Sequence, residues 1–361
     1  MQKHRIGIIG CGGIANGKHM PAISKLNDCE MVAFCDLILE RAEKAAKEYG
    51  TPDAKVYTDY HELLVDQTID SVRVLTPNKW HAQISIDAMR AGKHVLCEKP
   101  MAINYAESLE MIRAQKETGK VLTIGYQHKF DTDVLYTKAE AQKGVFGEIY
   151  FAKANVMRRR GVPTWGVFTQ KSEQGGGALI DIGTHVLDIA LHIMDNYEPL
   201  YVVGTTYDKL KNNEETANPF GPWDTEKYDV EESAFAFIVM KNGATIILEN
   251  SWALNTTDTA GVRYMVCGNK AGADNYGGKF KINGVNNNRM YITEPDLKAG
   301  GVAYYEGNSH SPTVMEQRVF IDACMGRGEL VTKPEAAAVV TRILEAIYIS
   351  AETGRPYYFE D

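Results

Sequence analysis

Short apolar runs alternate with helical segments through the first third of the chain, and this alternation restricts the possible folds more than any other feature. Five runs have the length and apolar content of buried strands: residues 5–10 (RIGIIG), 30–36 (EMVAFCD), 71–76 (SVRVLT), 94–97 (HVLC) and 121–126 (VLTIGY). Helical patterns follow the first four, and several of these helices close on glycine. Strands that alternate with helices are joined by right-handed crossovers in a buried parallel sheet. The sequence therefore predicts an α/β domain with a doubly wound parallel sheet over residues 1–126.

The pattern changes in the remaining residues, 127–361. Longer strand-like runs occupy residues 147–159, 198–207, 232–254 and 262–268. The Asn-Gly pair within residues 241–244 is typical of a tight hairpin. Helical patterns cover residues 175–194, 312–325 and 334–352. We expect an α+β domain with a large, open, mainly antiparallel sheet, in which the last helix is a candidate to pack back on the first domain.

A glycine-rich turn follows the first predicted strand. Gly10, Gly12 and Ala15 stand at G-x-G-x-x-A between a strand and a helix, which is the pattern of a Rossmann dinucleotide site. A glycine turn of an ordinary α/β protein is the alternative. The predicted cofactor contacts of this loop are Gly10, Cys11, Gly12, Gly13 and Ile14.

Asp36 ends the next predicted strand, where a carboxylate can accept hydrogen bonds from the adenosine ribose. Its negative charge would repel a 2′-phosphate, and no basic residue follows it before Arg41. The sequence therefore favours NAD over NADP.

Polar residues also follow the later strands at the same predicted edge of the sheet. Thr76, Pro77 and Asn78 would face the nicotinamide half of the cofactor, although Asn78 is equally compatible with a helix N-cap. His81 fits either a ligand contact or a packed side chain. Further predicted cofactor contacts at this edge are His81, Glu98, Lys99 and Gln127.

The sequence Glu98-Lys99-Pro100 ends the apolar run over residues 94–97 abruptly. Proline keeps its predecessor out of the helical region, so Lys99 is held in an extended or turn conformation at the carboxyl edge of the sheet. An exposed loop lysine is the alternative. Oxidation of an alcohol needs a group that takes the hydroxyl proton, and burial beside a positive charge favours the neutral amine that can do so. Lys99 is the predicted catalytic acid/base.

Acidic and histidine side chains alternate on one face of the helix predicted over residues 175–194. Asp181 and His185 are one turn apart, and Asp188 and His192 continue the face. Without cysteine or a third converging ligand, a hydrogen-bonded network at a domain interface is favoured over a metal site, and no metal is predicted. We expect His185 to share the substrate proton and Asp181 to bind a neighbouring hydroxyl and orient the imidazole.

Together, the motifs GCGGIA, CD, TPNKWH, CEKP and DIGTHVLD occur in order within the first 195 residues. This combination resembles the Gfo/Idh/MocA family, which includes glucose-fructose oxidoreductase and inositol dehydrogenase. The resemblance implies that Lys99, Asp181 and His185 form the catalytic group. It also implies hydride transfer between a nicotinamide and a hydroxyl or keto carbon of a sugar, inositol or related polyol, in a homodimer or homotetramer assembled through the large sheet.

An arginine run at residues 158–160 precedes an aromatic loop. Arg158 and Arg160 share one side of the predicted strand, and with Trp165 they would suit an acidic sugar such as a uronate. A solvated strand end or a subunit contact explains the run equally well. His128 is a further substrate candidate, and His310, in a predicted loop, fits either the pocket or solvent.

Composition excludes some classes of partner. The net charge of −8 argues against nucleic acid, and no stretch approaches the 18 or so apolar residues that a membrane span needs. The six cysteines form no C-x-x-C pair and the start lacks a signal-peptide core, so we expect a cytoplasmic protein.

Two other functions remain open at this point. One is a redox-neutral glycoside hydrolase or lyase that keeps NAD bound and acts through transient oxidation at C3 of a sugar. The other is a non-catalytic NAD-binding sensor, against which the joint presence of Lys99, Asp181 and His185 argues.

Overall fold

A computed structural model describes residues 3–297 and 311–360, and the chain divides into two compact units. The first contains Met1–Phe130 and Ser309–Ala338, and the second contains Asp131–Asn308 and Val339–Asp361. The sequence predicts one domain over 127–361, whose last helix is a candidate to pack back on the first domain. Residues 309–338 group with the first unit because their helix packs there and because Arg318 forms a two-pronged ion pair with Asp28, with distances of 2.7 and 3.0 Å. The domain boundary at residue 126 stays a prediction, and His310 lies outside the described residues.

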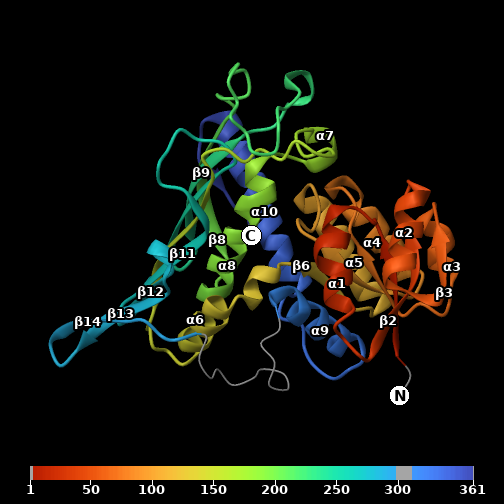
Figure 1. Ribbon diagram of the computed structural model, residues 1–361. Helices are drawn as coiled ribbons and strands as arrows, with labels where there is room; N and C mark the ends of the chain where they lie inside the picture. Colours follow the sequence, from red (N-terminus) through yellow and green to blue (C-terminus); the bar gives the residue numbers. More distant parts are fainter. Residues whose placement is uncertain (1–2, 298–310, 361) are drawn as a thin grey trace. The chain divides into compact units, whose positions relative to one another are not determined.

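The first unit is built on a six-stranded sheet in which all paired strands are parallel (Figure 1). Its strands, in the order β3-β2-β1-β4-β5-β6, are β1 (His4–Ile9), β2 (Cys29–Cys35), β3 (Gly50–Tyr57), β4 (Ser71–Val74), β5 (His94–Glu98) and β6 (Leu122–Gly125). The doubly wound parallel sheet is confirmed. The sequence analysis missed β3, because this edge strand is largely half-exposed and contains Pro52 and Asp53, so it forms no apolar run.

Helices and short helical turns connect these strands. They are η1 (Ala15–His19), α1 (Met20–Ile23), α2 (Leu39–Tyr49), α3 (Tyr60–Val65), η2 (Asn78–Trp80), α4 (His81–Arg90), α5 (Tyr105–Thr118), η3 (Gln127–Phe130) and α9 (Pro312–Cys324). The central strands are buried on both faces, as the successive residues Ile8 and Ile9 of β1 illustrate with exposures of 0 and 2%. This is the burial expected of a parallel sheet covered by helices.

The second unit contains a nine-stranded sheet. Its strands, in the order β14-β13-β12-β11-β7-β10-β9-β8-β15, are β7 (Ile149–Met157), β8 (Pro199–Tyr207), β9 (Ser233–Met240), β10 (Thr245–Ser251), β11 (Ala260–Gly268), β12 (Ala271–Asp274), β13 (Lys281–Asn286), β14 (Arg289–Thr293) and β15 (Tyr357–Tyr358). Only β7 and β10 pair in parallel among the described strands of this sheet. The predicted α+β unit with a mainly antiparallel sheet is confirmed, including the hairpin between β9 and β10, where Gly243 has a φ of +87°.

The second unit also contains helical segments. They are α6 (Thr132–Gln142), α7 (Lys171–Gln174), η4 (Leu179–Gly183), α8 (Thr184–Met194), η5 (Thr225–Lys227), η6 (Tyr276–Gly278) and, from residue 339 onward, α10 (Pro334–Thr353). Helix α8 packs against β7, β10 and β11, and Gly204 of β8 approaches Ile347 of α10 so closely that a Cβ would lie 2.7 Å from its Cγ2. Side chains of the opposite face, such as Val203, Tyr207 and Phe237, are exposed.

The helical stretch Lys171–Met194 is long and apolar enough, by length and mean hydropathy, to cross a membrane. However, 89% of its apolar window is buried inside the structure, where it packs on the large sheet. We therefore interpret this stretch as a core helix of the second unit.

Candidate active site

The glycine loop lies where β1 and β4 end side by side, at the point where the strand order of the sheet reverses. Gly10 has a φ of +94°, and a Cβ there would lie 2.6 Å from the carbonyl oxygen of Leu75. Only glycine meets both requirements without strain. By contrast, a Cβ on Gly12 or Gly13 would find no atom within 4 Å, so the backbone of the loop is open to a ligand.

The Asp36 carboxylate fixes this loop to the end of β2. Its Oδ2 accepts a hydrogen bond from the Cys11 N–H at 2.8 Å, and its Oδ1 accepts one from the Ile38 N–H at 2.9 Å. Each carboxylate oxygen has lone-pair capacity for one further donor. The predicted contact with ribose hydroxyls is compatible with this arrangement.

Thr76 supplies an independent sign of a ligand. Its Oγ1 is buried and has no hydrogen-bond partner in the part of the chain that the structure describes. A buried hydroxyl without a partner is costly. Its position, directly after β4 and Leu75, is at the same edge of the sheet as the open loop. The residues present therefore fit a dinucleotide, and the predicted contacts of Gly12 with the pyrophosphate and of Thr76 with the nicotinamide half stay predictions.

His81 holds two segments of this edge together. It is almost fully buried, with Nδ1 2.7 Å from the carbonyl oxygen of Pro100 and Nε2 2.9 Å from that of Thr76. Burial lowers the pKa of His81, and the two carbonyl oxygens act against this shift. This geometry favours the packed alternative over a direct ligand contact. Asn78 is the first residue of η2, and Pro77 precedes it.

Gln127, at the start of η3, is engaged within the unit. In the amide orientation that satisfies both of its atoms, it donates to the carbonyl oxygen of Gly125 at 2.9 Å and accepts from Lys18 Nζ at 3.0 Å. Its predicted cofactor contact, like that of Ile14, stays a prediction.

Lys99 lies directly after β5 and is partly exposed, and its peptide bond to Pro100 is cis. The preceding Glu98 is buried and accepts hydrogen bonds at both oxygens, with Oε1 2.7 Å from His19 Nε2 and Oε2 3.0 Å from the Lys99 N–H. Burial alone would raise the pKa of Glu98. The hydrogen bond from His19, together with the positive charges of Lys99 and Lys18, lowers this pKa below its usual range. Glu98 is therefore an ionised group that holds the Lys99 backbone.

In the second unit, Asp181 and His185 lie on the continuous segment formed by η4 and α8. Asp181 accepts a hydrogen bond from Trp252 Nε1 at 2.9 Å, and the indole itself is fully buried. His185 is buried on the same segment, as is Asp188, whereas His192 is only partly buried. In the described residues, no group of three or more His, Cys, Asp or Glu side chains is arranged to hold a metal ion.

Glu231 anchors the start of this helical segment. It accepts hydrogen bonds from the Gly177 N–H at 2.9 Å, the Leu179 N–H at 2.8 Å and the Tyr348 hydroxyl at 2.9 Å. A carboxylate on the first N–H groups of a helix satisfies donors that have no partner within the helix. The sequence analysis missed Glu231 and Trp252, because both lie far along the chain from the helix that they fix.

The predicted substrate residues have varied surroundings. Arg160 donates to the carbonyl oxygen of Thr216 at 3.0 Å and to Asn255 Oδ1 at 2.9 Å, and Arg158 donates to the carbonyl oxygen of Gly161 at 3.0 Å. These bonds favour a structural role for the arginines. Trp165 is about half exposed (53%) and contacts Phe168 and Phe220 edge-on. His128, on η3, is partly buried, and all these substrate assignments stay predictions.

The chain matches two descriptions of known protein families. Residues 4–126 match the oxidoreductase family with an NAD-binding Rossmann fold, and residues 134–274 match the GFO/IDH/MocA C-terminal domain.

Similar proteins agree with these matches. The chain is 34% identical over 350 residues to D-glucoside 3-dehydrogenase of Escherichia coli (strain K12), covering 97% of this chain and 96% of that protein. It is 27% identical over 248 residues to myo-inositol 2-dehydrogenase of Thermotoga maritima, covering 68% of each. The solved structure of levoglucosan dehydrogenase in complex with NADH has a TM-score of 0.83 over 100% of both chains at 21% identity, which shows the shared fold.

The two kinds of glycine in the loop give a prediction. Gly12→Val is expected to leave the unfolding temperature of the cofactor-free protein unchanged, because the new Cβ meets no protein atom, and to weaken NAD binding at least about 30-fold by blocking the close approach of the pyrophosphate. Gly10→Ala is expected to lower the unfolding temperature, because it combines a clash with an αL-type strain of about 1–2 kcal/mol. Scanning calorimetry measures the unfolding temperature, and titration calorimetry measures the affinity for NAD. Wild-type NAD affinity in Gly12→Val would contradict the assigned site.

Proposed function

Because the chain belongs to the Gfo/Idh/MocA oxidoreductase family, and is on that basis an NAD-dependent sugar dehydrogenase acting on CH–OH groups, we propose that it oxidises the C3 hydroxyl of a D-glucoside. The observation that carries this choice of substrate is the 34% identity to D-glucoside 3-dehydrogenase over almost the full length of both chains. The inositol dehydrogenases match a smaller part of the chain. The product is the 3-keto glucoside, and the reverse reaction reduces it.

In this proposal Lys99 Nζ takes the proton of the C3 hydroxyl, and the amine returns it in the reverse direction. A bound nicotinamide would supply the hydride acceptor for the same carbon. His185 shares the hydroxyl proton, and Asp181 binds a neighbouring hydroxyl of the sugar. The support for these roles is the place of Lys99 after β5, the fixed orientation of the Asp181 carboxylate by Trp252, and the family motifs on which all three residues lie.

We assign NAD rather than NADP as the cofactor on the basis of Asp36. Its carboxylate is held at the end of β2 by two backbone N–H groups, and a 2′-phosphate brought there would meet its negative charge. The six cysteines are all free thiols, which supports a cytoplasmic location.

The product of the reaction tests the function. With methyl β-D-glucoside and NAD, we expect NADH to accumulate and NMR to identify the 3-keto glucoside. Lys99→Met is expected to lower turnover at least about 100-fold, because it removes the acid/base group, while NAD affinity changes less than about threefold.

Lys116→Met is the matched control, since it removes an exposed lysine from helix α5 of the same unit and is expected to retain wild-type turnover. Release of free glucose without NADH accumulation would contradict this function and indicate the redox-neutral hydrolase instead. NAD binding without turnover on any sugar would favour the sensor. Near-normal turnover in Lys99→Met would contradict the role of the lysine.

We also propose that a second copy of the chain covers the open face of the large sheet. Val203 of β8 and Phe237 of β9 are cross-strand neighbours on this face and are exposed, as is Tyr207. An exposed apolar patch on a sheet is typical of an interaction site.

Phe237→Lys is therefore expected to convert a dimer or tetramer to a smaller species in analytical ultracentrifugation, because it places a charge in the apolar contact. Lys241→Ala, a change in the turn after β9, serves as the control and should leave the mass unchanged. A wild-type protein that is monomeric at micromolar concentration would contradict the proposed assembly.

A further inference from the structure

A chain of buried hydrogen bonds runs through the first unit and ends at Lys99. Arg73 Nε donates to Gln317 Oε1 at 2.7 Å, Gln317 Nε2 lies 3.0 Å from His19 Nδ1, and His19 Nε2 lies 2.7 Å from Glu98 Oε1. The relative exposures of Arg73, Gln317, His19 and Glu98 are 0, 0, 1 and 6%. The other oxygen of Glu98 accepts the Lys99 N–H. Four elements, β4, α9, η1 and β5, thus contribute to one connected network.

The chemistry of the two ends permits one arrangement of hydrogens. A guanidinium can only donate, and an ionised carboxylate can only accept. Gln317 must therefore turn its oxygen to Arg73 and its N–H to His19 Nδ1, and His19 must carry its proton on Nε2 and donate it to Glu98. Every bond points the same way, from the buried cation to the buried anion. Nη2 of Arg73 has no hydrogen-bond partner among the described residues, but along this path each donor meets an acceptor. A connected buried path of this kind fixes the side chains that belong to it.

Both ends of the network are anchored. Arg73 NH1 donates to Ser71 Oγ at 2.9 Å, and its guanidinium carbon lies 4.5 Å from the centre of the Phe320 ring on α9. At the other end, Pro100 presents its carbonyl oxygen to His81. The backbone on each side of the Lys99–Pro100 bond is therefore held by a buried polar contact.

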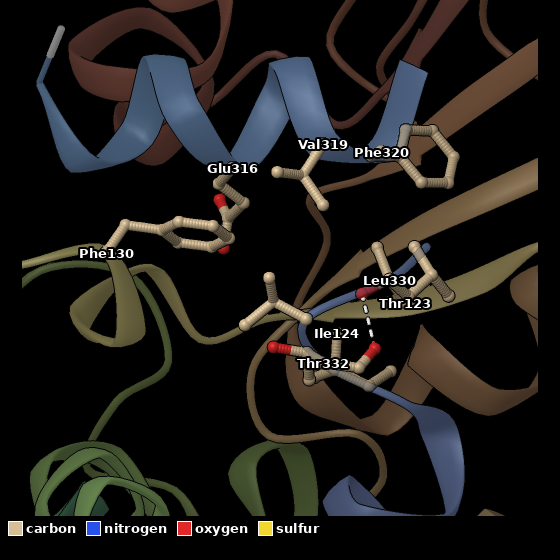
Figure 2. Close-up of a pocket in the computed structure, with 9 residues that line it drawn as sticks. Thr123, Ile124, Phe130, Glu316, Val319, Phe320, Leu330 and Thr332 are labelled. Carbon is tan, nitrogen blue, oxygen red and sulfur yellow. Dashed lines mark hydrogen bonds between the residues drawn. The ribbon is translucent and has the colours of Figure 1, made fainter. Parts of the chain in front are cut away.

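A neighbouring carboxyl group does not compete with Glu98. Glu316, one residue before Gln317, projects from α9 toward Phe130 in a small cavity that is also lined by Thr123 and Thr332 (Figure 2). Burial, and then the charge of Glu98, raise the pKa of Glu316 well above its usual range. Its Oε1 has no hydrogen-bond partner among the residues described.

We propose that His19 and Gln317 are positioning residues, which act through Glu98 to hold the backbone of Lys99 and so aim its amine at the substrate hydroxyl. The inference rests on the proposed role of Lys99 as the acid/base. It assigns a catalytic purpose to α9, which lies more than 200 residues after Lys99 in the sequence. A misplacement of the amine by about 1 Å is enough to lower the rate about 100-fold.

Two substitutions of one residue test the proposal most sharply. In His19→Gln the side-chain amide reaches the place of the ring Nε2 and can still donate to Glu98, whereas in His19→Asn it reaches only the place of Nδ1. We expect hydrogen exchange of the Lys99 N–H in the cofactor-free protein to be at least about tenfold faster in His19→Asn and close to wild type in His19→Gln. Two-dimensional NMR follows this single amide.

Turnover is the second readout. In His19→Asn and Gln317→Met we expect kcat to fall about 10- to 100-fold, while the KM for the glucoside and the affinity for NAD change less than about threefold. His19→Gln is expected to restore most of the lost kcat. A role in stability alone would lower the unfolding temperature of all three variants without this division between kcat and KM.

Arg318→Met is the matched control on the same helix. It breaks the ion pair between α9 and Asp28 without touching the network, so it is expected to lower the unfolding temperature but to leave kcat and Lys99 exchange unchanged. Equal exchange of Lys99 in His19→Asn and the wild type, or equally fast exchange in Arg318→Met, would overturn the proposal. The exchange result does not depend on catalysis, so it separates a failure of this inference from a failure of the proposed function, which Lys99→Met reports.

Discussion

The buried Glu98 carboxylate is the group on which the arrangement of the first unit depends. An ion inside a protein is stable only if charge and hydrogen bonds surround it. Here His19 and the Lys99 N–H donate hydrogen bonds to Glu98. Arg73 supplies a buried positive charge and is connected to Glu98 through the side chains of Gln317 and His19. This requirement links the end of β5 to α9, and it explains why a C-terminal helix belongs to the unit that binds the nucleotide.

The two units use the same physical means to fix functional side chains. In the first, the close approach of Gly10 to Leu75 and the two hydrogen bonds of Asp36 shape the nucleotide loop. In the second, Glu231 satisfies the first N–H groups of the helix that carries Asp181, and Trp252 orients the carboxylate itself. In both units a buried, hydrogen-bonded group lies directly behind a residue assigned to chemistry, Glu98 behind Lys99 and Trp252 behind Asp181. Rigid support of this kind is what a reactive group needs to keep its geometry.

The sequence predicted features that depend on local pattern. The parallel strands, the hairpin at Asn242 and Gly243, and the place of Lys99 after β5 all follow from apolar periodicity and from the conformational limits of glycine and proline. It did not predict β3, whose residues are too polar for a buried strand, or the partners that arrive from distant segments. Gln317 and His19 form a hydrogen bond although they are 298 positions apart in the sequence, and Trp252 and Asp181 do so 71 positions apart. The periodicity of a local segment carries no information about contacts between such distant residues. The hydrogen bonds of Arg160 to Thr216 and Asn255 could not be predicted from the sequence for the same reason.

The central claim is that Glu98 stays ionised in the interior and thereby holds the backbone of the acid/base lysine. Carbon-13 NMR of the Glu98 carboxyl group between pH 3.5 and pH 8 tests it directly, with Glu98→Gln identifying the signal. Because the hydrogen bond from His19 and the charges of Lys99 and Lys18 outweigh the effect of burial and lower the pKa of Glu98, we expect the chemical shift of a carboxylate at every pH in this range. Protonation of Glu98 with a midpoint at or above the ordinary value of about 4.3 would contradict it.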